Sequence, residues 1–263
     1  MLAGQHVVLG VTGSIAAYKA VDLASKLTQA GALVDVVMTR AALEFVRPLA
    51  FRTITHRPVV SDLFDPDSEL ALEHVALAER ADIVVVAPAT ANVIAKMAHG
   101  LADDALTCTV LATKAPVVVA PAMDARMYDN PATQENVQRL RDRGFTIVGP
   151  EHGRLASGLA GIGRLAAIED IVGTASMVLG RQKGDLAGRR LVVTAGGTQE
   201  PIDPVRFVSN RSSGKMGFAI AEAARDRGAR VALITAPAAL PDPVGVETQR
   251  VRTAQEMHDA VAK

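Results

Sequence analysis

Residues 6–38 read HVVLGVTGSIAAYKAVDLASKLTQAGALVDVVM, and this stretch decides the class of fold. The apolar run at its start is typical of a buried strand, and a Gly-Ser turn follows it. A helical pattern covers residues 15–30, Gly31 occupies the expected C-terminal cap, and a second apolar run follows at 33–38. Strand, helix and strand in this order predict a βαβ unit with parallel strands.

The same alternation of apolar runs and helical patterns continues through most of the chain. Strands are predicted at 6–10, 33–38, 82–87, 116–120 and 145–148, and further helices at 91–98, 104–112, 133–143 and 168–180. Strands that alternate with helices are typical of a parallel sheet wound with crossover helices. We therefore expect an α/β domain with a Rossmann- or flavodoxin-like parallel sheet.

A polar stretch at 181–185 has no apolar period and marks the best domain boundary, so the predicted domains are 1–183 and 187–263. In the second range, strands are predicted at 190–194 and 230–235, and helices at 215–227 and from about 254. Two strands and two helices are fewer than an open α/β domain needs to cover both faces of its sheet. We expect this range to be the start of a second Rossmann-like α/β domain that is a fragment or is completed by a partner.

The composition excludes several classes of protein. The chain has 263 residues, of which 49% are hydrophobic, and its 28 basic residues balance its 28 acidic ones, which gives no attraction to nucleic acid. No segment approaches the roughly eighteen apolar residues of a membrane span, and the first eleven residues lack the marks of a signal peptide. The single cysteine, Cys108, excludes an intrachain disulfide and a multi-cysteine zinc site. We expect a cytoplasmic protein with no metal, membrane or nucleic-acid partner.

Three predicted strands end in turns that suit ligand binding. Residues 8–17, VLGVTGSIAA, give a strand, a Gly-Ser turn and a helix start, which together present N–H groups to a phosphate. Residues 84–92, VVVAPATAN, and 121–128, PAMDARMY, follow the same plan. The other readings are ordinary βα turns without the full G-x-G-x-x-G pattern, Thr90 as a plain N-cap, and methionines that fill the core. Because the carboxyl ends of parallel strands meet at one edge of a sheet, we favour shared ligand binding.

A second unusual stretch lies at 194–217, TAGGTQEPIDPVRFVSNRSSGKMG, directly after the predicted strand at 190–194. Gly196 and Gly197 let the backbone turn sharply and approach an anionic group. Hydrogen-bond donors follow just before the predicted helix, from Asn210, Arg211, Ser212, Ser213 and Lys215. The pattern favours a ligand site over the other reading, a long polar crossover loop whose Gly and Pro only shape turns.

These motifs carry a resemblance to a known family. Residues 13–17, His74, 88–92 and 121–127 match, in order and spacing, the marks of the homo-oligomeric flavin-containing cysteine decarboxylases, and this resemblance covers about residues 5–180. The stretch 194–217 resembles the start of the ligase half of the phosphopantothenoylcysteine decarboxylase/phosphopantothenate–cysteine ligase family of coenzyme A biosynthesis. The resemblance therefore extends along the whole chain.

The resemblance implies an FMN-dependent decarboxylation of a small molecule, 4'-phosphopantothenoylcysteine, to 4'-phosphopantetheine. Direct loss of carbon dioxide would leave an unstabilised carbanion, and in the family FMN avoids this by first oxidising the carbon that bears the thiol. The family's ligase half joins 4'-phosphopantothenate to cysteine with CTP and Mg²⁺. Its nucleotide-binding segments and catalytic lysine lie beyond the position of Lys263, so we do not expect ligase activity from this chain.

The matching positions imply roles for individual residues. The flavin phosphate is expected at Gly13, Ser14 and Ile15, and the rest of the cofactor at Thr39, Pro88, Ala89, Thr90, Ala91 and Asn92. His74 matches the catalytic histidine, a residue type suited to proton transfer, although the residues alone favour a histidine on an amphipathic surface helix. The substrate is expected at Met123, Met127, Gly158, Gly161 and Arg164, and Asn210 matches an asparagine tied to the acyl-cytidylate of the ligase.

Three positions depart from the family pattern. Asp124 and Asp103 stand where asparagine is expected, and at the first of these the family's asparagine holds the substrate carboxylate. An ionised Asp124 would repel that carboxylate, whereas a protonated one would donate a hydrogen bond but requires burial to raise its pKa. Ser157 stands where many relatives have a cysteine that donates a proton in the final reduction, and a hydroxyl is a far weaker acid than a thiol. The glycines that follow it, Gly158, Gly161 and Gly163, suit a mobile lid.

Two other classes stay open at the level of sequence. A flavin prenyltransferase-like enzyme would share the FMN fold, although it would not account for residues 194–217. A non-catalytic regulatory member of the flavoprotein family would tolerate the changes at Asp124 and Ser157. The family also implies a homo-oligomer, commonly built from trimers, with flavin sites between subunits.

Overall fold

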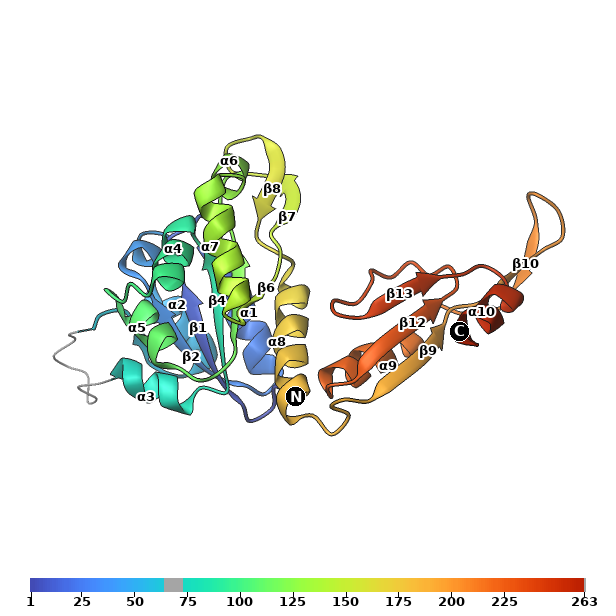
Figure 1. The fold of residues 1–263 in the computed structure, drawn as a ribbon, viewed down its shortest axis with the longest axis horizontal. Coiled ribbons are helices and arrows are strands. Elements are labelled where there is room, and N and C mark those ends of the chain that lie inside the picture. The colour runs from blue at the N-terminus through green and yellow to red at the C-terminus, as the bar shows by residue number, and fades with distance from the viewer. Residues whose placement is uncertain (64–72, 263) are drawn as a thin grey trace. The chain divides into compact units, whose positions relative to one another are not determined.

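The computed structural model describes residues 1–63 and 73–262, and Figure 1 shows its fold. The chain forms two compact units, Leu2–Ala175 and Ser176–Lys263, the second of which also includes Met1. We call them the N-terminal unit and the C-terminal unit. The division falls inside helix α8 (Ile168–Lys183), whereas the sequence pattern places the boundary after that helix, so the domain ranges 1–183 and 187–263 stay a prediction.

The N-terminal unit is built on a sheet of six parallel strands in the order β3-β2-β1-β4-β5-β6. The chain first runs from the centre to one edge through β1 (His6–Val11), β2 (Leu33–Met38) and β3 (Val59–Val60). It then returns to the centre and runs to the other edge through β4 (Ile83–Ala89), β5 (Val117–Pro121) and β6 (Thr146–Ile147). This order confirms the predicted Rossmann-type α/β fold. The direction of winding changes between β1 and β4, which is where open sheets of this type bind ligands.

Helices cover both faces of this sheet (Figure 1). On one face, α1 (Ala17–Gln29) packs against α2 (Pro48–Thr55), and a 3-10 turn η1 (Arg40–Glu44) follows β2. On the other face, α4 (Ala91–His99) packs against both α5 (Ala105–Ala112) and α7 (Pro131–Asp142), and α5 also packs against α3 (Glu73–Arg80). A short helix α6 (Ala125–Tyr128) follows β5. An antiparallel hairpin of β7 (Glu151–Arg154) and β8 (Ala160–Arg164) lies against α6.

Burial explains why the central strands read as continuous apolar runs. Val7, Val8 and Leu9 of β1 are fully buried, as expected of a strand covered by helices on both faces. α5 is buried along much of its length and begins with a capping box, in which the Asp104 carboxylate accepts a hydrogen bond from the backbone N–H of Thr107 at 2.8 Å. The sheet and its helices therefore share a core, and the loops at the strand ends extend from it.

A buried carboxylate connects three parts of the N-terminal unit. Asp35 of β2 is 3% exposed, and it accepts hydrogen bonds from Arg57 Nε at 2.7 Å and Arg57 Nη2 at 3.3 Å. Arg80 Nη2, at the end of α3, lies 3.2 Å from Asp35 Oδ1. Because a buried carboxylate is unfavourable unless it is paired, this cluster holds α3 and the segment after α2 against β2.

The C-terminal unit contains a parallel sheet in the order β13-β12-β9, formed by β9 (Arg190–Ala195), β12 (Arg230–Thr235) and β13 (Glu247–Arg250). It also contains α9 (Lys215–Asp226), α10 (Ala254–Val261) and an antiparallel hairpin of β10 (Gln199–Pro201) and β11 (Phe207–Ser209). The expectation of only two strands here is wrong, because β13 is a polar, largely exposed edge strand without an apolar run. The β10–β11 hairpin lies within the stretch 194–217, which is therefore not a loop throughout.

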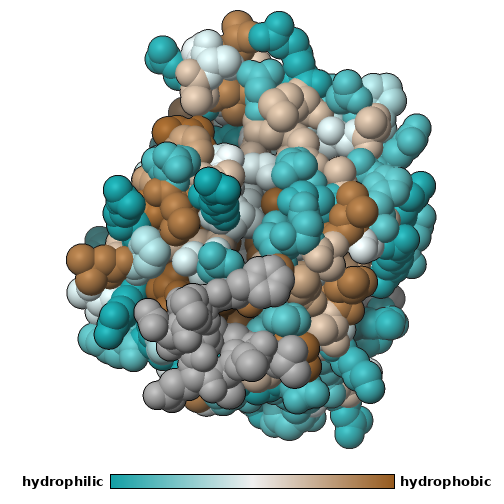
Figure 2. Space-filling view, turned by 90° about the vertical axis from the view of Figure 1, so that its left-hand side faces the viewer, coloured by the Kyte–Doolittle hydropathy of each residue, from teal (hydrophilic) through white to brown (hydrophobic). Residues whose placement is uncertain are grey.

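The surface of the described residues is mixed in character. On the face shown in Figure 2, apolar residues are interspersed with hydrophilic ones. Exposed apolar side chains of the N-terminal unit include Leu49, Leu101 and Leu111, which lie on or beside three different helices. None of the helices in the described part of the chain has both the length and the apolar character to span a bilayer.

Candidate functional site

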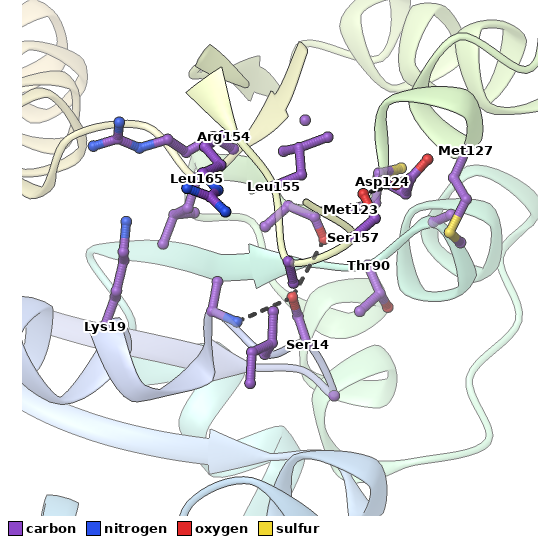
Figure 3. Close-up of a pocket in the computed structure, with 18 of the residues that line it drawn as sticks. Ser14, Lys19, Thr90, Met123, Asp124, Met127, Arg154, Leu155, Ser157 and Leu165 are labelled. Atoms are coloured by element: carbon purple, nitrogen blue, oxygen red, sulfur yellow. Dashed lines mark hydrogen bonds between the residues drawn. The ribbon is translucent and has the colours of Figure 1, made fainter. Parts of the chain in front are cut away.

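A cavity of about 750 Å³ opens at the carboxyl ends of β1, β4 and β5 (Figure 3). Its wall is formed by residues that follow each of these three strands, together with residues of the β7–β8 hairpin and its turn. The volume lies in the range of small-molecule and cofactor sites, roughly 300–1,000 Å³. The cavity therefore occupies the position that the strand order predicts for a ligand.

A single hydroxyl ties the ends of β1 and β4 together. Thr12 is fully buried, and its Oγ1 donates to the carbonyl oxygen of Pro88 at 2.7 Å and accepts from the backbone N–H of Thr90 at 3.1 Å. Thr90 in turn caps α4, because its side-chain oxygen accepts a hydrogen bond from the N–H of Val93. Thr12 thus holds two of the predicted ligand-binding turns side by side, although the motifs do not single it out.

The turn after β1 passes very close to the segment after β2. A Cβ on Gly13 would lie 2.5 Å from the Cβ of Ala41, so a larger residue at this position requires the two segments to move apart. Ser14 Oγ accepts a hydrogen bond from the N–H of Ala16 at 3.3 Å and lies 3.5 Å from the carbonyl oxygen of Ala122, to which it donates. Because α1 begins at this wall of the cavity, its first N–H groups suit an anionic ligand.

Asp124 and Ser157, two of the departures from the family pattern, are in direct contact. Ser157 Oγ donates to Asp124 Oδ2 at 2.8 Å. Asp124 Oδ1 caps α6 by accepting from the backbone N–H of Arg126 at 3.1 Å, and the Arg126 guanidinium lies 3.6 Å from the same oxygen. The hydrogen bond from Ser157, and after it that from the Arg126 backbone, lower the pKa of Asp124 below its ordinary value. Asp124 is therefore ionised at neutral pH, and the reading in which it is protonated and donates a hydrogen bond is not supported.

The same contact determines where the Ser157 proton points. An ionised carboxylate only accepts hydrogen bonds, so the single proton of the Ser157 hydroxyl is directed at Asp124. The hydroxyl oxygen keeps its capacity to accept a hydrogen bond, but in this geometry it has no further proton to donate to a ligand.

The β7–β8 hairpin is packed tightly against the segment that leads into α6. The N–H of Met123 donates to the carbonyl oxygen of Gly163 at 3.0 Å, and a Cβ on Gly163 would lie 2.2 Å from the carbonyl oxygen of Met123. A Cβ on Gly161 would lie 2.6 Å from the Cβ of Ala125. Gly158, with a φ of +85°, forms the turn between the strands. The three glycines thus serve close packing and a tight turn, which is a different reason from the mobile lid that the sequence suggests.

The cavity brings together residues that are far apart in the sequence, and Figure 3 shows how they surround it. Those of its lining residues that the sequence predicts for the cofactor or substrate are Gly13, Ser14, Ile15, Thr90, Ala91, Met123, Asp124, Met127, Ser157 and Arg164. Because they come from each of the three predicted turns and from the hairpin, the sequence-predicted residues converge on one place.

Other predicted residues do not line this cavity. Thr39 is buried at the end of β2, Pro88 and Ala89 are buried within β4, and Asn92 is exposed on α4. Gly158 and Gly161 belong to the hairpin, and His74 is partly buried on α3. Asn210 is exposed in the C-terminal unit, directly after β11. The roles inferred for these residues stay predictions.

Comparison with known proteins adds to this geometry. A family model described as "Flavoprotein" matches residues 1–180. The chain belongs to the Flavoprotein family. A second model, "DNA/pantothenate metabolism flavoprotein C-terminal domain", matches residues 186–263. The two matches together cover nearly all of the chain.

Curated relatives of this Flavoprotein family member share about half of its residues. The coenzyme A biosynthesis bifunctional protein CoaBC of Vibrio cholerae is 48% identical over 262 residues, which cover 100% of this chain and 65% of the relative. CoaBC of Bacillus subtilis is 48% identical over 99% of this chain and 65% of the relative, and CoaBC of Mycobacterium tuberculosis is 49% identical over 98% and 62%. The chain thus spans somewhat less than two thirds of the length of these relatives.

Solved structures similar to this Flavoprotein match about two thirds of the chain. A PPC decarboxylase mutant complexed with pantothenoylaminoethenethiol is 32% identical with a TM-score of 0.59, and the match covers 65% of this chain and 96% of that one. The FMN-dependent cysteine decarboxylase SpaF is 36% identical with a TM-score of 0.58, covering 68% and 97%. The FMN binding protein AtHal3 is 32% identical with a TM-score of 0.56, covering 65% and 94%.

Sequence reasoning missed several residues that line the cavity of this Flavoprotein. Tyr18 and Lys19 lie in the first turn of α1, three and four residues after the predicted residue Ile15. Arg154, Leu155 and Leu165 bracket the glycines of the hairpin. Their signal in the sequence is only their position next to a predicted site residue.

Proposed function

We propose that the N-terminal unit is an FMN-dependent decarboxylase that converts 4'-phosphopantothenoylcysteine to 4'-phosphopantetheine in coenzyme A biosynthesis. One observation carries this proposal: the three turns predicted to bind FMN and substrate surround a single cavity at the switch point of the sheet. Similarity to FMN-dependent cysteine decarboxylases and to CoaBC proteins supports it. Because these relatives are named as decarboxylases or coenzyme A biosynthesis proteins, they favour a decarboxylase over a flavin prenyltransferase-like enzyme or a non-catalytic member of the flavoprotein family.

The residues present fit the expected cofactor. Thr39 is only 7% exposed, and its Oγ1 has no hydrogen-bond partner among the described residues, which is unusual for a buried hydroxyl. A polar ligand atom would satisfy it. Gly13 allows the close approach of the two segments that lead away from β1 and β2. We propose that Gly13, Ser14 and Ile15 hold the FMN phosphate, and that Thr39 and residues 88–92 surround the rest of the cofactor.

Bound FMN would supply the two-electron oxidation, and its reversal, that loss of carbon dioxide from a cysteinyl carboxylate requires. The residues of the chain bind and orient the substrate. Met123, Leu155 and Leu165 provide apolar wall, which excludes water from the reacting carbon. Asp124 is ionised, so it repels a carboxylate and instead accepts a hydrogen bond from an N–H or S–H group of the substrate.

His74 is proposed as the group that transfers protons during the reaction. It lies on α3 and does not line the cavity of its own chain. We propose a trimer-based homo-oligomer in which His74 serves a cavity completed by a neighbouring subunit. Mixing an inactive His74→Ala variant with an inactive Gly13→Val variant then restores part of the activity, whereas a cavity complete within one chain gives no recovery in the mixture.

The C-terminal unit is proposed to belong to a phosphopantothenate–cysteine ligase domain that uses CTP and Mg²⁺. The match of residues 186–263 to a pantothenate metabolism domain supports this assignment, with Asn210 at the acyl-cytidylate. We also propose that the protein acts in the cytoplasm. Asn210→Ala is expected to leave decarboxylation unchanged, so it serves as a control for the experiment below.

The experiment that tests the proposed decarboxylase is anaerobic incubation of the purified, FMN-loaded protein with 4'-phosphopantothenoylcysteine. Flavin absorbance is followed, and the product is identified by mass spectrometry. Formation of 4'-phosphopantetheine with the flavin left oxidised supports the full reaction. A product two hydrogens lighter with bleached flavin locates the loss in the last reduction, where Ser157 replaces a cysteine. No product from FMN-loaded protein refutes the proposal.

A further inference from the structure

Two cations on the cavity wall have no counterion among the described residues. Lys19 of α1 and Arg154 at the end of β7 both line the cavity, and neither side chain makes an ion pair or a hydrogen bond to another residue in that part of the chain. A third lining cation, Arg164, differs from them because its Nε lies 4.0 Å from Glu151 Oε2. Lys19 and Arg154 therefore carry positive charge that residues 1–63 and 73–262 leave uncompensated.

These two cations lie toward one side of the cavity and the acidic group lies toward the other. In Figure 3, Lys19 and Arg154 are on the left, whereas Asp124 and Met127 are on the right. Asp124 is ionised at neutral pH, and hydrogen bonds from Ser157 and from the Arg126 backbone hold its pKa below the ordinary value. Since like charges repel and opposite charges attract, an anionic end of a ligand favours the side of Lys19 and Arg154.

Apolar side chains also line the cavity. Ile15, Leu155 and Leu165 all line the cavity, and Ile15 is 59% exposed, so its side chain is available to a ligand. A ligand that fits this cavity has apolar or neutral surface, a strongly anionic end near Lys19 and Arg154, and a hydrogen-bond donor near Asp124. The anionic end fits a phosphate monoester, which carries about 1.5 to 2 negative charges at neutral pH.

We propose that Lys19 and Arg154 form a subsite for a phosphate monoester at one end of the cavity. Arg154 offers a planar fork of donors that pairs with two phosphate oxygens, and Lys19 adds a compact charge. Two molecules of the proposed reaction carry such a group, the substrate with its 4'-phosphate and FMN with its ribityl phosphate. The proposal rests on the proposed function, and it assigns the recognition of that phosphate to residues that the sequence motifs do not include.

Substrate discrimination tests the first source. In the wild type, kcat/KM for 4'-phosphopantothenoylcysteine is expected to exceed that for unphosphorylated pantothenoylcysteine by about a hundredfold, because two charge-assisted contacts contribute about tenfold each. In the double variant Lys19→Gln with Arg154→Gln, the ratio of kcat/KM for the phosphorylated substrate to kcat/KM for the unphosphorylated one is expected to fall toward one. The matched control is Lys26→Gln with Arg141→Gln, which removes the same charges from exposed positions of α1 and α7 outside the cavity.

Flavin binding tests the second source. The dissociation constants of FMN and riboflavin are measured by quenching of flavin fluorescence in the wild type and both double variants. If the subsite holds the ribityl phosphate, the Lys19/Arg154 variant loses the preference for FMN over riboflavin while the substrate preference is retained. Either loss of preference supports the phosphate subsite and names its occupant.

The subsite is overturned if the Lys19/Arg154 variant keeps both preferences, or if it weakens phosphorylated and unphosphorylated ligands equally. Failure of the proposed function is a separate result, in which the wild type turns over neither substrate. In that case, calorimetric titration of FMN-loaded wild type and variant with both pantothenoylcysteine compounds replaces the kinetic comparison and still decides the proposal.

Discussion

The close packing of the β7–β8 hairpin on the segment before α6 predicts that Gly163→Ala is strongly disruptive. The new Cβ would lie 2.2 Å from the carbonyl oxygen of Met123. An ordinary carbon–oxygen approach is about 3.3 Å, so the strand has to move outward by about 1 Å. That movement also stretches the 3.0 Å hydrogen bond from the N–H of Met123 to the carbonyl oxygen of Gly163.

The magnitude follows from these two effects. Overpacking at a rigid contact costs about 1–3 kcal/mol, and the loss of one backbone hydrogen bond adds about 1 kcal/mol. The free energy of unfolding of the N-terminal unit is therefore expected to fall by about 2–4 kcal/mol. For a unit of this size, each kcal/mol corresponds to about 2–4 °C in Tm, so the predicted decrease is about 4–16 °C.

Gly158→Ala is the matched control, since it makes the same chemical change in the same hairpin. A Cβ there meets no atom of residues 1–63 and 73–262 within 4 Å, and the expected penalty is the φ of +85°, which is worth about 1–2 kcal/mol. The stabilisation that alanine brings by restricting the unfolded chain is common to both variants and cancels in the comparison.

The assay combines thermal unfolding by calorimetry with limited trypsin digestion at Arg154, beside the hairpin turn, and at Arg164, at the opposite end of β8. Gly163→Ala is expected to melt below Gly158→Ala and to be cleaved faster at these arginines, because the strand is pushed away from Met123. If Gly163→Ala melts at or above the temperature of Gly158→Ala and its cleavage rate equals that of the wild type, the steric reasoning is refuted.

Three further predictions follow from contacts in the N-terminal unit. Thr12→Val leaves the Pro88 carbonyl and the Thr90 N–H without their partner and is expected to lower the free energy of unfolding in urea by about 1–3 kcal/mol. Thr39→Val removes a hydroxyl that has no hydrogen-bond partner in the described part of the chain and is expected to leave stability unchanged, so equal effects of the two substitutions contradict this reasoning. Asp35→Asn breaks a buried ion pair and is expected to lower the free energy of unfolding by about 3 kcal/mol. This value is the lower end of the usual range, because Arg57 and Arg80 are partly exposed. An unchanged midpoint of chemical denaturation rules this prediction out. Ser157→Ala is expected to raise the pKa of Asp124 toward its ordinary value of 3.8, as followed by carboxyl ¹³C NMR. Because the folded pKa is lowered, the stability that this contact contributes is fully present above pH 3.8 and is lost as the pH falls through the folded pKa, so wild type and variant converge in acid; an identical Asp124 titration in both proteins refutes the contact.

The long elements were predictable because a strand that is buried on both faces has apolar residues at successive positions in the sequence. β1, β2, β4 and β5 are central strands covered by helices, and each reads as a mainly apolar run, which in β2 is interrupted by Asp35. The predicted strands 33–38 and 230–235 agree with the structure to the residue, and most other predicted boundaries differ from the observed ones by one to three residues. Short or exposed elements have no such apolar run. α6 has four residues, and β13 reads ETQR.

The candidate site was predictable only in its parts. Gly13, Ser14 and Thr90 stand in turns whose chemistry is local, so their motifs indicate ligand binding without knowledge of the fold. The contacts that join these parts are not local. Thr12 reaches Pro88 and Thr90 across 76 and 78 positions, and Ser157 reaches Asp124 across 33. No periodicity or spacing in the sequence encodes these distances.

By itself, the sequence determined the α/β class, the strand ends that carry ligand-binding turns, and the family resemblance, because apolar periodicity and turn chemistry act between residues close together in the chain. Only the tertiary structure decided the strand order, the lowered pKa of Asp124 and the separation of Lys19 and Arg154 from it. Each of these depends on which distant segments pack together. The pKa of a carboxyl group, in particular, is shifted by the hydrogen bonds that it receives, and Asp124 receives its leading one from a hairpin that the sequence alone does not place beside it.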